Sequence, residues 1–192
     1  MAFVSTFELL LKPQLPKAIT ASRPELAGLT RTVIQGYFLT ISNITDNLIY
    51  LSVVFTTRTP GIERGKVLAL LDTLGTNDPT SEVFNGVGEI KKTRFTFPVN
   101  ANDTGLFILQ PNALDKALVA ASNFEVRGYV EIALSSVSTP KTAQIIVTPE
   151  HRGTFFGTSA LSIPSDKSEL GEIAYALPLA NGQSLFNLGK DL

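Results

Sequence analysis

Two long apolar runs, separated by a short polar cluster, dominate residues 31–60 and limit what the chain can fold into. In the second run, residues 49–55, a large apolar side chain recurs at every other position. β-Branched and aromatic residues in this pattern are typical of a strand with one buried face. Asn43, Asp46 and Asn47 are residues that turns favour, and Pro60 ends the second run. The pattern predicts a β-hairpin at the centre of the core.

A third alternating segment lies at the N-terminus. The residues on its predicted buried face are Phe3, Phe7, Leu9 and Leu11. Pro13, Pro16 and Pro24 then predict an extended connector, because proline lacks the N–H donor of a ladder hydrogen bond. Consecutive elements usually pack together, so we expect this strand to lie within its own subunit. The alternative is that it completes the sheet of a neighbouring copy.

Two more pairs of strands are expected further along the chain. Residues 93–110 alternate on both sides of the turn-rich sequence NANDTG, which predicts a second hairpin. Residues 124–135 show the clearest alternation of apolar and polar side chains, and residues 142–149 are predicted as their antiparallel neighbour. Both pairs favour an antiparallel, strand-rich domain.

Helical patterns are few. Residues 66–74 fit either a helix, by the spacing of Val67 and Leu71, or a strand, by the alternation of Leu68 and Leu70. We favour a strand because the rest of the chain is rich in strands. Residues 111–122 hold the strongest helix formers of the chain, with Asn112 in position to cap them. They predict a short helix that crosses between sheets.

Together these segments predict a mostly β fold, an antiparallel β-sandwich or jelly roll of about eight or nine strands with one or two short helices and extended terminal arms. In this prediction residues 1–30 form the N-terminal strand and its proline-rich connector, and residues 31–150 form the sandwich core. Residues 151–192 mix turn residues with apolar ones and lack a firm period. We expect them to form an irregular apolar arm that packs on the same domain or on a neighbour.

The composition indicates a folded domain with a neutral surface. Hydrophobic residues make up 44% of the chain and charged residues 17%, compared with about 25% charged residues in typical soluble domains. Because 16 basic residues are balanced by 17 acidic ones, we expect no nucleic-acid partner. The absence of cysteine excludes disulfides and thiol chemistry within the chain. No stretch approaches the roughly 18 apolar residues of a membrane helix, and the N-terminus lacks a signal-peptide pattern.

Candidate catalytic and metal-binding residues are isolated from one another. His151 is the only histidine, which excludes a two-histidine metal site in one chain, and its context predicts ordinary hydrogen bonding in a loop. Glu125 and Glu131 share one face of a strand but are about 20 Å apart at roughly 3.3 Å per residue, too far for a hydrolytic pair. Asp46 and the turns at 76–79 and 100–105 lack the spacing of a calcium loop. We therefore expect no catalytic residue, cofactor or metal.

The neutral, slightly hydrophobic composition and the apolar ends of the chain favour a protein that associates with itself or with another protein. We expect a non-enzymatic structural or assembly subunit of a filament, tube, shell or surface layer. The candidate assembly contacts are Phe3, Phe7, Leu9, Leu11, Phe155, Phe156, Leu185 and Phe186. The alternative is an adhesion or ligand-binding module for sugar or peptide, with Arg127 and Tyr129 as the candidate ligand face.

Overall fold

A computed structural model describes residues 1–192 except 59, 74, 81, 88–89, 158–170 and 191–192. The elements in chain order are β1 (Ala2–Pro13), α1 (Lys17–Ser22), the 3₁₀ helix η1 (Pro24–Leu29), β2 (Arg31–Asn43), β3 (Ile49–Thr57), β4 (Val67–Asp72), β5 (Asp78–Pro79), β6 (Glu82–Val87), β7 (Ile90–Val99), β8 (Thr104–Pro111), α2 (Lys116–Ala121), β9 (Phe124–Leu134), β10 (Thr142–Gly157), β11 (Gly171–Ala176) and β12 (Leu185–Gly189). The predicted mostly β fold with short helices is confirmed.

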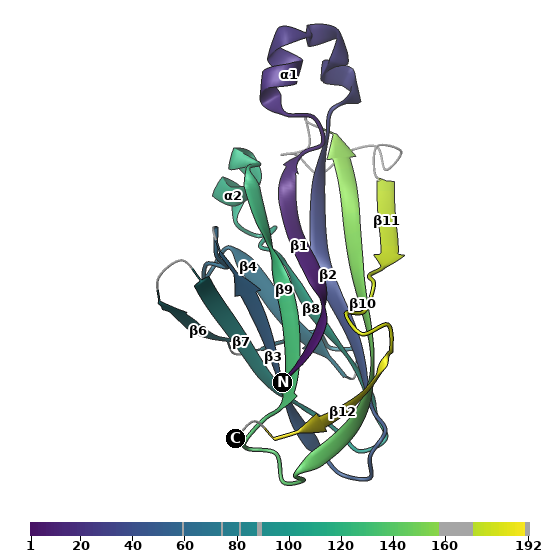
Figure 1. Cartoon of the computed structure of the whole chain (residues 1–192). Coiled ribbons are helices and arrows are strands. Elements are labelled where there is room, and N and C mark those ends of the chain that lie inside the picture. Colours follow the sequence, from purple (N-terminus) through teal and green to yellow (C-terminus); the bar gives the residue numbers. More distant parts are fainter. Residues whose placement is uncertain (59, 74, 81, 88–89, 158–170, 191–192) are drawn as a thin grey trace.

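The strands form one antiparallel sheet that curls into a half-barrel, consistent with a β-sandwich or jelly-roll-like fold (Figure 1). Its main path runs β5-β4-β8-β2-β1-β9-β3-β7-β6, and β10 pairs with β2 and carries β11 and β12 on its other edge. We call β1, β9, β3, β7 and β6 the β9 layer. The remaining strands, which include β2, β8 and β10, form the β8 layer.

Strand β2 is where the two layers divide. One of its edges pairs with β10 along its whole length. Its other edge pairs with β1 at residues 32–35 and then with β8 at residues 37–42. Gly36 lies at the change of partner, where a Cβ atom would stand only 2.8 Å from Cβ of Gln110. Glycine is therefore needed here because the neighbouring strand approaches so closely.

Aromatic side chains from both layers meet in the core. The rings of Phe97, on β7, and Phe107, on β8, are stacked with their centres 5.4 Å apart. Phe55, on β3, meets Phe7 of β1 edge-on at 4.9 Å. Offset and edge-to-face pairs of this kind stabilise by about 0.5–1.5 kcal/mol beyond the area they bury. The core thus lies between the layers and is filled from five or more strands by side chains that share one cluster.

The strands expected over residues 31–60 are present, but the predicted hairpin is wrong. β2 and β3 do not pair, and loop 44–48 crosses between the layers. Loop 100–103 crosses beside it, because the N–H of Asn102 donates to the carbonyl of Thr45 at 3.1 Å and the N–H of Asn43 donates to that of Asp103 at 2.9 Å. The buried Asn43 amide also donates to the carbonyl of Asn100 at 2.8 Å. The polar cluster ties two crossing loops together.

The two other predicted strand pairs are wrong for the same reason. β7 pairs with β3 and β6, whereas β8 pairs with β2 and β4. β9 pairs with β1 and β3, and β10 pairs with β2, β11 and β12. Loops with strong turn signals therefore connect opposite layers. Alternation is the same in a hairpin and in a crossing pair, since both bury one face.

The two ambiguous or helical segments resolve clearly. Residues 67–72 form strand β4, as favoured from the sequence. The expected helix forms, but its N-cap is Asp115, whose carboxylate accepts from the N–H groups of Ala117 and Leu118. Asn112 is not the cap and instead accepts from the N–H of Leu114 at 3.0 Å. An Asx turn at Asn112 thus precedes the helix, which begins after Asp115.

The terminal segments pack on the same chain. β1 lies inside the sheet, paired with β2 and β9 of the same chain. A bulge between Phe3 and Ser5 turns Val4 inward in place of Phe3. β10 continues through residue 151, and the described part of the C-terminal segment then forms β11 and β12, more regular than expected. No helix in the described ranges is long and apolar enough to cross a membrane.

Candidate functional site

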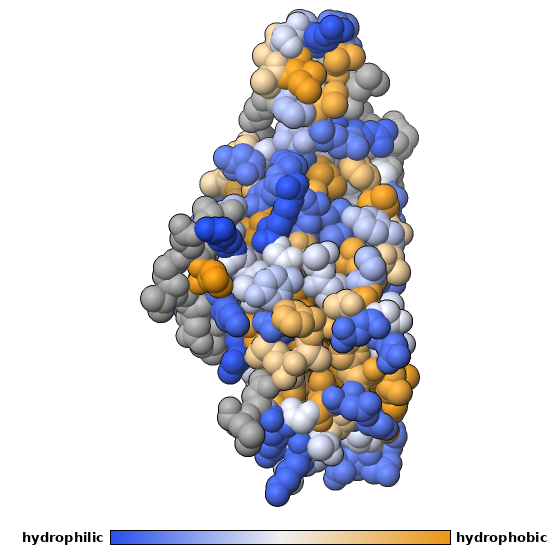
Figure 2. All heavy atoms as spheres, viewed as in Figure 1, coloured by the Kyte–Doolittle hydropathy of each residue, from blue (hydrophilic) through white to orange (hydrophobic). Residues whose placement is uncertain are grey.

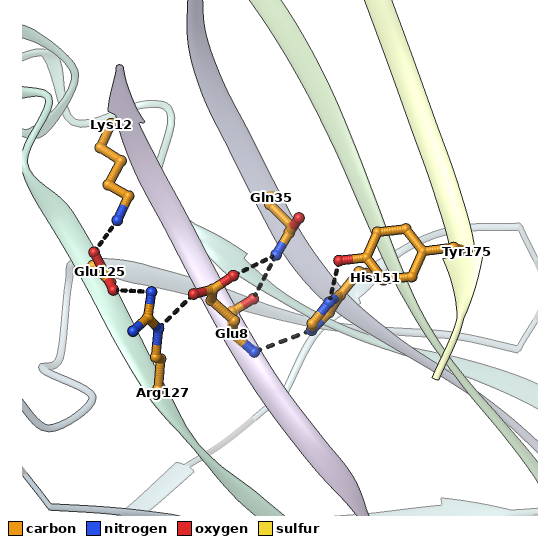
Figure 3. Close-up of polar contacts among 7 residues, drawn as sticks. All are labelled: Glu8, Lys12, Gln35, Glu125, Arg127, His151 and Tyr175. Carbon is orange, nitrogen blue, oxygen red and sulfur yellow. Dashed lines mark hydrogen bonds and ion pairs between the residues drawn. The ribbon is translucent and has the colours of Figure 1, made fainter. Parts of the chain in front are cut away.

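A row of polar side chains crosses five strands where the layers divide (Figure 3). Its members are Arg127 on β9, Glu8 on β1, Gln35 on β2, His151 on β10 and Tyr175 on β11. Neighbours in the row are set by strand register, since Glu8 stands opposite Arg127 and His151 opposite Tyr175. We call this set the polar row. It draws together polar groups from distant parts of the described chain.

His151 is the centre of the polar row and is only 5% exposed. Its Nε2 accepts from the N–H of Glu8 at 3.0 Å, and its Nδ1 lies 3.0 Å from the hydroxyl of Tyr175. Because Nε2 acts as acceptor, the neutral ring carries its proton on Nδ1 and donates it to Tyr175. Burial lowers the pKa of His151, and the Glu8 carboxylate opposes that shift only in part. The loop position expected for this histidine is wrong, because it lies within β10.

Side chains of the polar row cover a stretch of one edge of β1 that has no strand partner, and we call this stretch the seam. Residues 4–8 of β1 pair with β9 on one side only, because the β1–β2 ladder begins at Leu10. On the open side, Gln35 donates to the carbonyl of Glu8 at 3.3 Å and His151 accepts from its N–H. The N–H of Ala180 donates to the carbonyl of Val4 at 2.8 Å. Side chains and a passing loop thus replace the missing strand partner.

Tyr37 lies beneath the seam and strengthens it. Its hydroxyl is 3.0 Å from the hydroxyl of Ser5, which is buried on β1. The Tyr37 ring also packs edge-on against His151, with centres 6.4 Å apart. Burial raises the pKa of Tyr37 strongly, and the hydrogen bond with Ser5 offsets part of the shift. A phenol held protonated in this way serves as a structural hydrogen-bonding group.

A chain of ion pairs extends from Arg127 of the polar row to Glu125 and Lys12. Nε of Arg127 lies 2.5 Å from the Glu8 carboxylate, and its Nη2 lies 2.5 Å from that of Glu125. Lys12 also pairs with Glu125, and the hydrogen bond from Lys12 is the main reason that the pKa of Glu125 lies below its usual value. In Figure 2 one group of strongly hydrophilic side chains lies over the upper parts of β1 and β9. These groups satisfy one another.

On the candidate ligand face of β9, Arg127 and Tyr129 already contact other side chains of the protein. Arg127 keeps 65% of its side chain exposed but is held by two carboxylates. Tyr129 is 39% exposed, and its ring packs against that of Phe3 with centres 5.7 Å apart. The structure therefore places Arg127 and Tyr129 on one face, with Phe3 as the neighbour that sequence reasoning had not joined to them.

The candidate assembly contacts do not form one patch. Those in the shared core are Phe7, Leu9, Leu11 and Phe186. Phe155 and Phe156 are half-buried. Phe3 is 54% exposed on the outer face of the β9 layer, whereas Leu185 is 46% exposed and stands opposite Ile146 on the other layer.

The outer face of the β8 layer carries large apolar side chains interspersed with the polar residues Thr40, Ser42, Thr104 and Thr148. The large apolar side chains on this face come from five strands, and they are Phe38, Leu68, Leu70, Leu106, Ile108, Ile146 and Leu185. Gly36 forms the floor of a shallow hollow of about 330 Å³ on this face, and Arg152 lines it. The Arg152 guanidinium lies over the Phe38 ring at 4.8 Å and pairs with Glu150.

Strand β11 borders this layer and is exposed along its length. Among the described residues it pairs only with β10. Ile173 is 41% exposed and Tyr175 is 43% exposed. Sequence reasoning missed this strand, although GEIAYA is a short run with β-favouring Ile and Tyr and a single charge.

Neither metal sites nor relatives identify an activity. No group of three His, Asp or Glu side chains is placed to hold a metal ion within the described ranges. Comparisons with protein-family models, curated proteins and solved structures give no match.

Proposed function

We propose that the chain is a non-enzymatic structural subunit that functions by associating with further copies of itself, as in a filament, tube, shell or surface layer. The observation that carries the proposal is the group of large apolar side chains on the outer face of the β8 layer. Its most exposed members are Ile146, at 40%, and Leu185, at 46%, which face each other across β10 and β12. Fully burying one such side chain stabilises by about 1.5–3 kcal/mol, so a few contacts supply a useful interface.

Two further observations support this function. The formal net charge is −1, so copies of the chain repel one another weakly. The polar row is the best candidate for a catalytic site, but its only histidine has a structural role. Both ring nitrogens of His151 are engaged, one with the backbone of Glu8 and one with Tyr175. A general base needs a free nitrogen within reach of a substrate proton.

The test is light scattering behind a sizing column over a range of concentrations, with electron micrographs of the largest fraction. We expect particles larger than one chain of 20.7 kDa, with a size that increases with concentration. A double variant, Ile146→Lys with Leu185→Lys, should shift the distribution towards monomer. Val137→Lys is the control, because Val137 is 65% exposed in the loop between β9 and β10 and lies outside every strand. A monomer at every concentration would contradict the proposal.

A second candidate function is adhesion to a sugar or peptide through Phe3 and Tyr129. The observation that favours it is their ring contact at 5.7 Å, with both rings exposed on the outer face of the β9 layer. Exposed aromatic pairs offer an apolar platform with a polar rim, here beside Arg127. Glycan and peptide arrays test it, with Tyr129→Ala as the variant that should lose any signal. Equal signal from Tyr129→Ala would remove this site.

A further inference from the structure

The free sheet edges of the described chain differ in how they are protected. β5 is two residues long and ends in Pro79, so it offers almost no ladder to another strand. β6 lies next to β7, which carries Lys91, Lys92 and Arg94, so pairing two such edges would bring basic clusters together. β11 has six residues, one charge and no proline. Within the described residues it carries no proline, lysine or bulge that would keep an edge strand from pairing.

We propose that β11 pairs with β11 of a second copy of this chain, antiparallel, so that the β8 layer continues across a two-fold axis. This inference rests on the proposed function and names the surface through which association begins. The open backbone groups of β11 would then find partners in the ladder of the second copy. The contact is isologous, since the same strand is presented by both subunits.

Symmetry limits the register. A two-fold axis perpendicular to the sheet keeps each side chain on its own face, and opposite residues of antiparallel strands also share a face. The axis must therefore pass through a residue, because an axis between two residues would pair side chains of opposite faces. An axis through Glu172 would place two like charges directly opposite, which is destabilising.

An axis through Ala174 gives the best pairs. It places Ile173 opposite Tyr175 of the second copy, and the symmetric pair forms as well. β-Branched residues opposite aromatic ones are favourable cross-strand neighbours. Ala174 meets its own copy with little bulk, and Glu172 meets Ala176, so no carboxylates collide. An axis through Ile173 would instead set each Tyr175 opposite Gly171, which offers no side chain to pack against.

The geometry also joins this edge to the apolar face. Ala174 and Glu172 pair with Arg152 and Thr154 of β10, beside the hollow on the outer face of the β8 layer. Two copies joined at β11 would place their apolar outer faces side by side on one continuous sheet. A larger face is then available for the next contact of the assembly.

Disulfide trapping reads the register directly, because the chain has no cysteine of its own. In the proposed register the Cα atoms of Ala174 and its copy are about 4.5 or 5.5 Å apart, within the range for a disulfide. Glu172 is separated from its copy by four residues, about 13 Å at roughly 3.3 Å per residue, which is out of range. We expect Ala174→Cys to form a covalent dimer under mild oxidation. Glu172→Cys, exposed on the same strand face, should not.

A charge on the edge provides the second measurement. Ile173→Lys should reduce self-association at least tenfold and leave the circular dichroism spectrum and thermal midpoint near those of the wild type. Leu114→Lys is the matched control, since Leu114 is 81% exposed and lies outside every strand. It should associate like the wild type.

The outcomes separate this inference from the proposed function. If wild-type protein assembles but Glu172→Cys crosslinks as readily as Ala174→Cys, or Ile173→Lys assembles normally, the β11 contact is wrong and self-association stands. If wild-type protein is monomeric at every concentration and Ala174→Cys does not crosslink, both are wrong. Selective crosslinking of Ala174→Cys together with a monomeric Ile173→Lys establishes the contact.

Discussion

Strands β1 and β11 both contribute side chains to the polar row and have opposite surroundings. β1 has a ladder with β9 over most of its length, and its other edge is closed by β2 and by the side chains of Gln35 and His151. β11 has one ladder, with β10, and exposed side chains. Proximity to a chain end therefore does not make a strand available to a partner. What matters is whether both of its edges are satisfied.

Among the substitutions that compare β1 with β11, we expect the largest loss of stability from one in the core. Phe7 is 2% exposed and contacts the rings of Phe55 and Tyr37. Phe7→Ala should lower the free energy of unfolding by about 3–5 kcal/mol, because it removes a buried ring and leaves a cavity. Urea unfolding measures this change.

Ile173→Ala on β11 is the control for Phe7→Ala, and its cost should stay below about 1 kcal/mol because the side chain is already partly in water. A Phe7→Ala protein that is as stable as the wild type but no longer associates would reverse the comparison. β1 would then be the donated strand, which was the alternative left open by the sequence.

The second effect concerns the seam. His151→Leu removes the acceptor of the Glu8 N–H and leaves that buried donor without a partner, which should cost about 1–3 kcal/mol in the free energy of unfolding. His151→Gln keeps an acceptor and should recover part of the loss. Chemical denaturation of both variants provides the comparison. Equal stability of His151→Leu and the wild type would show that the seam is closed by its other contacts alone.

The strand content of this chain could be predicted from its sequence, and the pairing could not. Residues 124–134 alternate cleanly and form β9 as expected. The turn residues Asn43 and Asn102 mark real loops, yet these loops hydrogen-bond to each other and cross between layers. A turn signal reports that the chain reverses and does not report which strand becomes the neighbour. That choice depends on the contact between two loops far apart in sequence.

Two parts of the candidate site had a signal that could have been used. In β10 the buried side chains are those with odd residue numbers, beginning with Ala143 and Ile145, and the same alternation continues to His151. At the N-terminus, polar Ser5 falls on the face predicted to be buried, which marks the bulge that replaces Phe3 by Val4. The exposed edge of β11 had no such signal, because an edge is defined by strands that are absent beside it.

The smallest effect is the dependence of stability on pH. Burial lowers the pKa of His151 below its ordinary value of about 6.5, so the unfolded chain takes up a proton more readily than the folded one. Stability is then complete above about pH 6.5 and decreases as the pH falls from there towards the lower folded pKa.

A protonated ring would also face the Glu8 N–H with a second donor, which opens the seam on the side of β10. The hydrogen bond from Lys12 lowers the pKa of the nearby Glu125 carboxylate, so this group does not account for a change between pH 6.5 and 5. Unfolding free energies measured at intervals over this range should decline with a slope of at most one proton in the wild type. They should stay level in His151→Gln. A parallel decline in both proteins would mean that another group controls the pH response and that the seam on β1 does not sense acid.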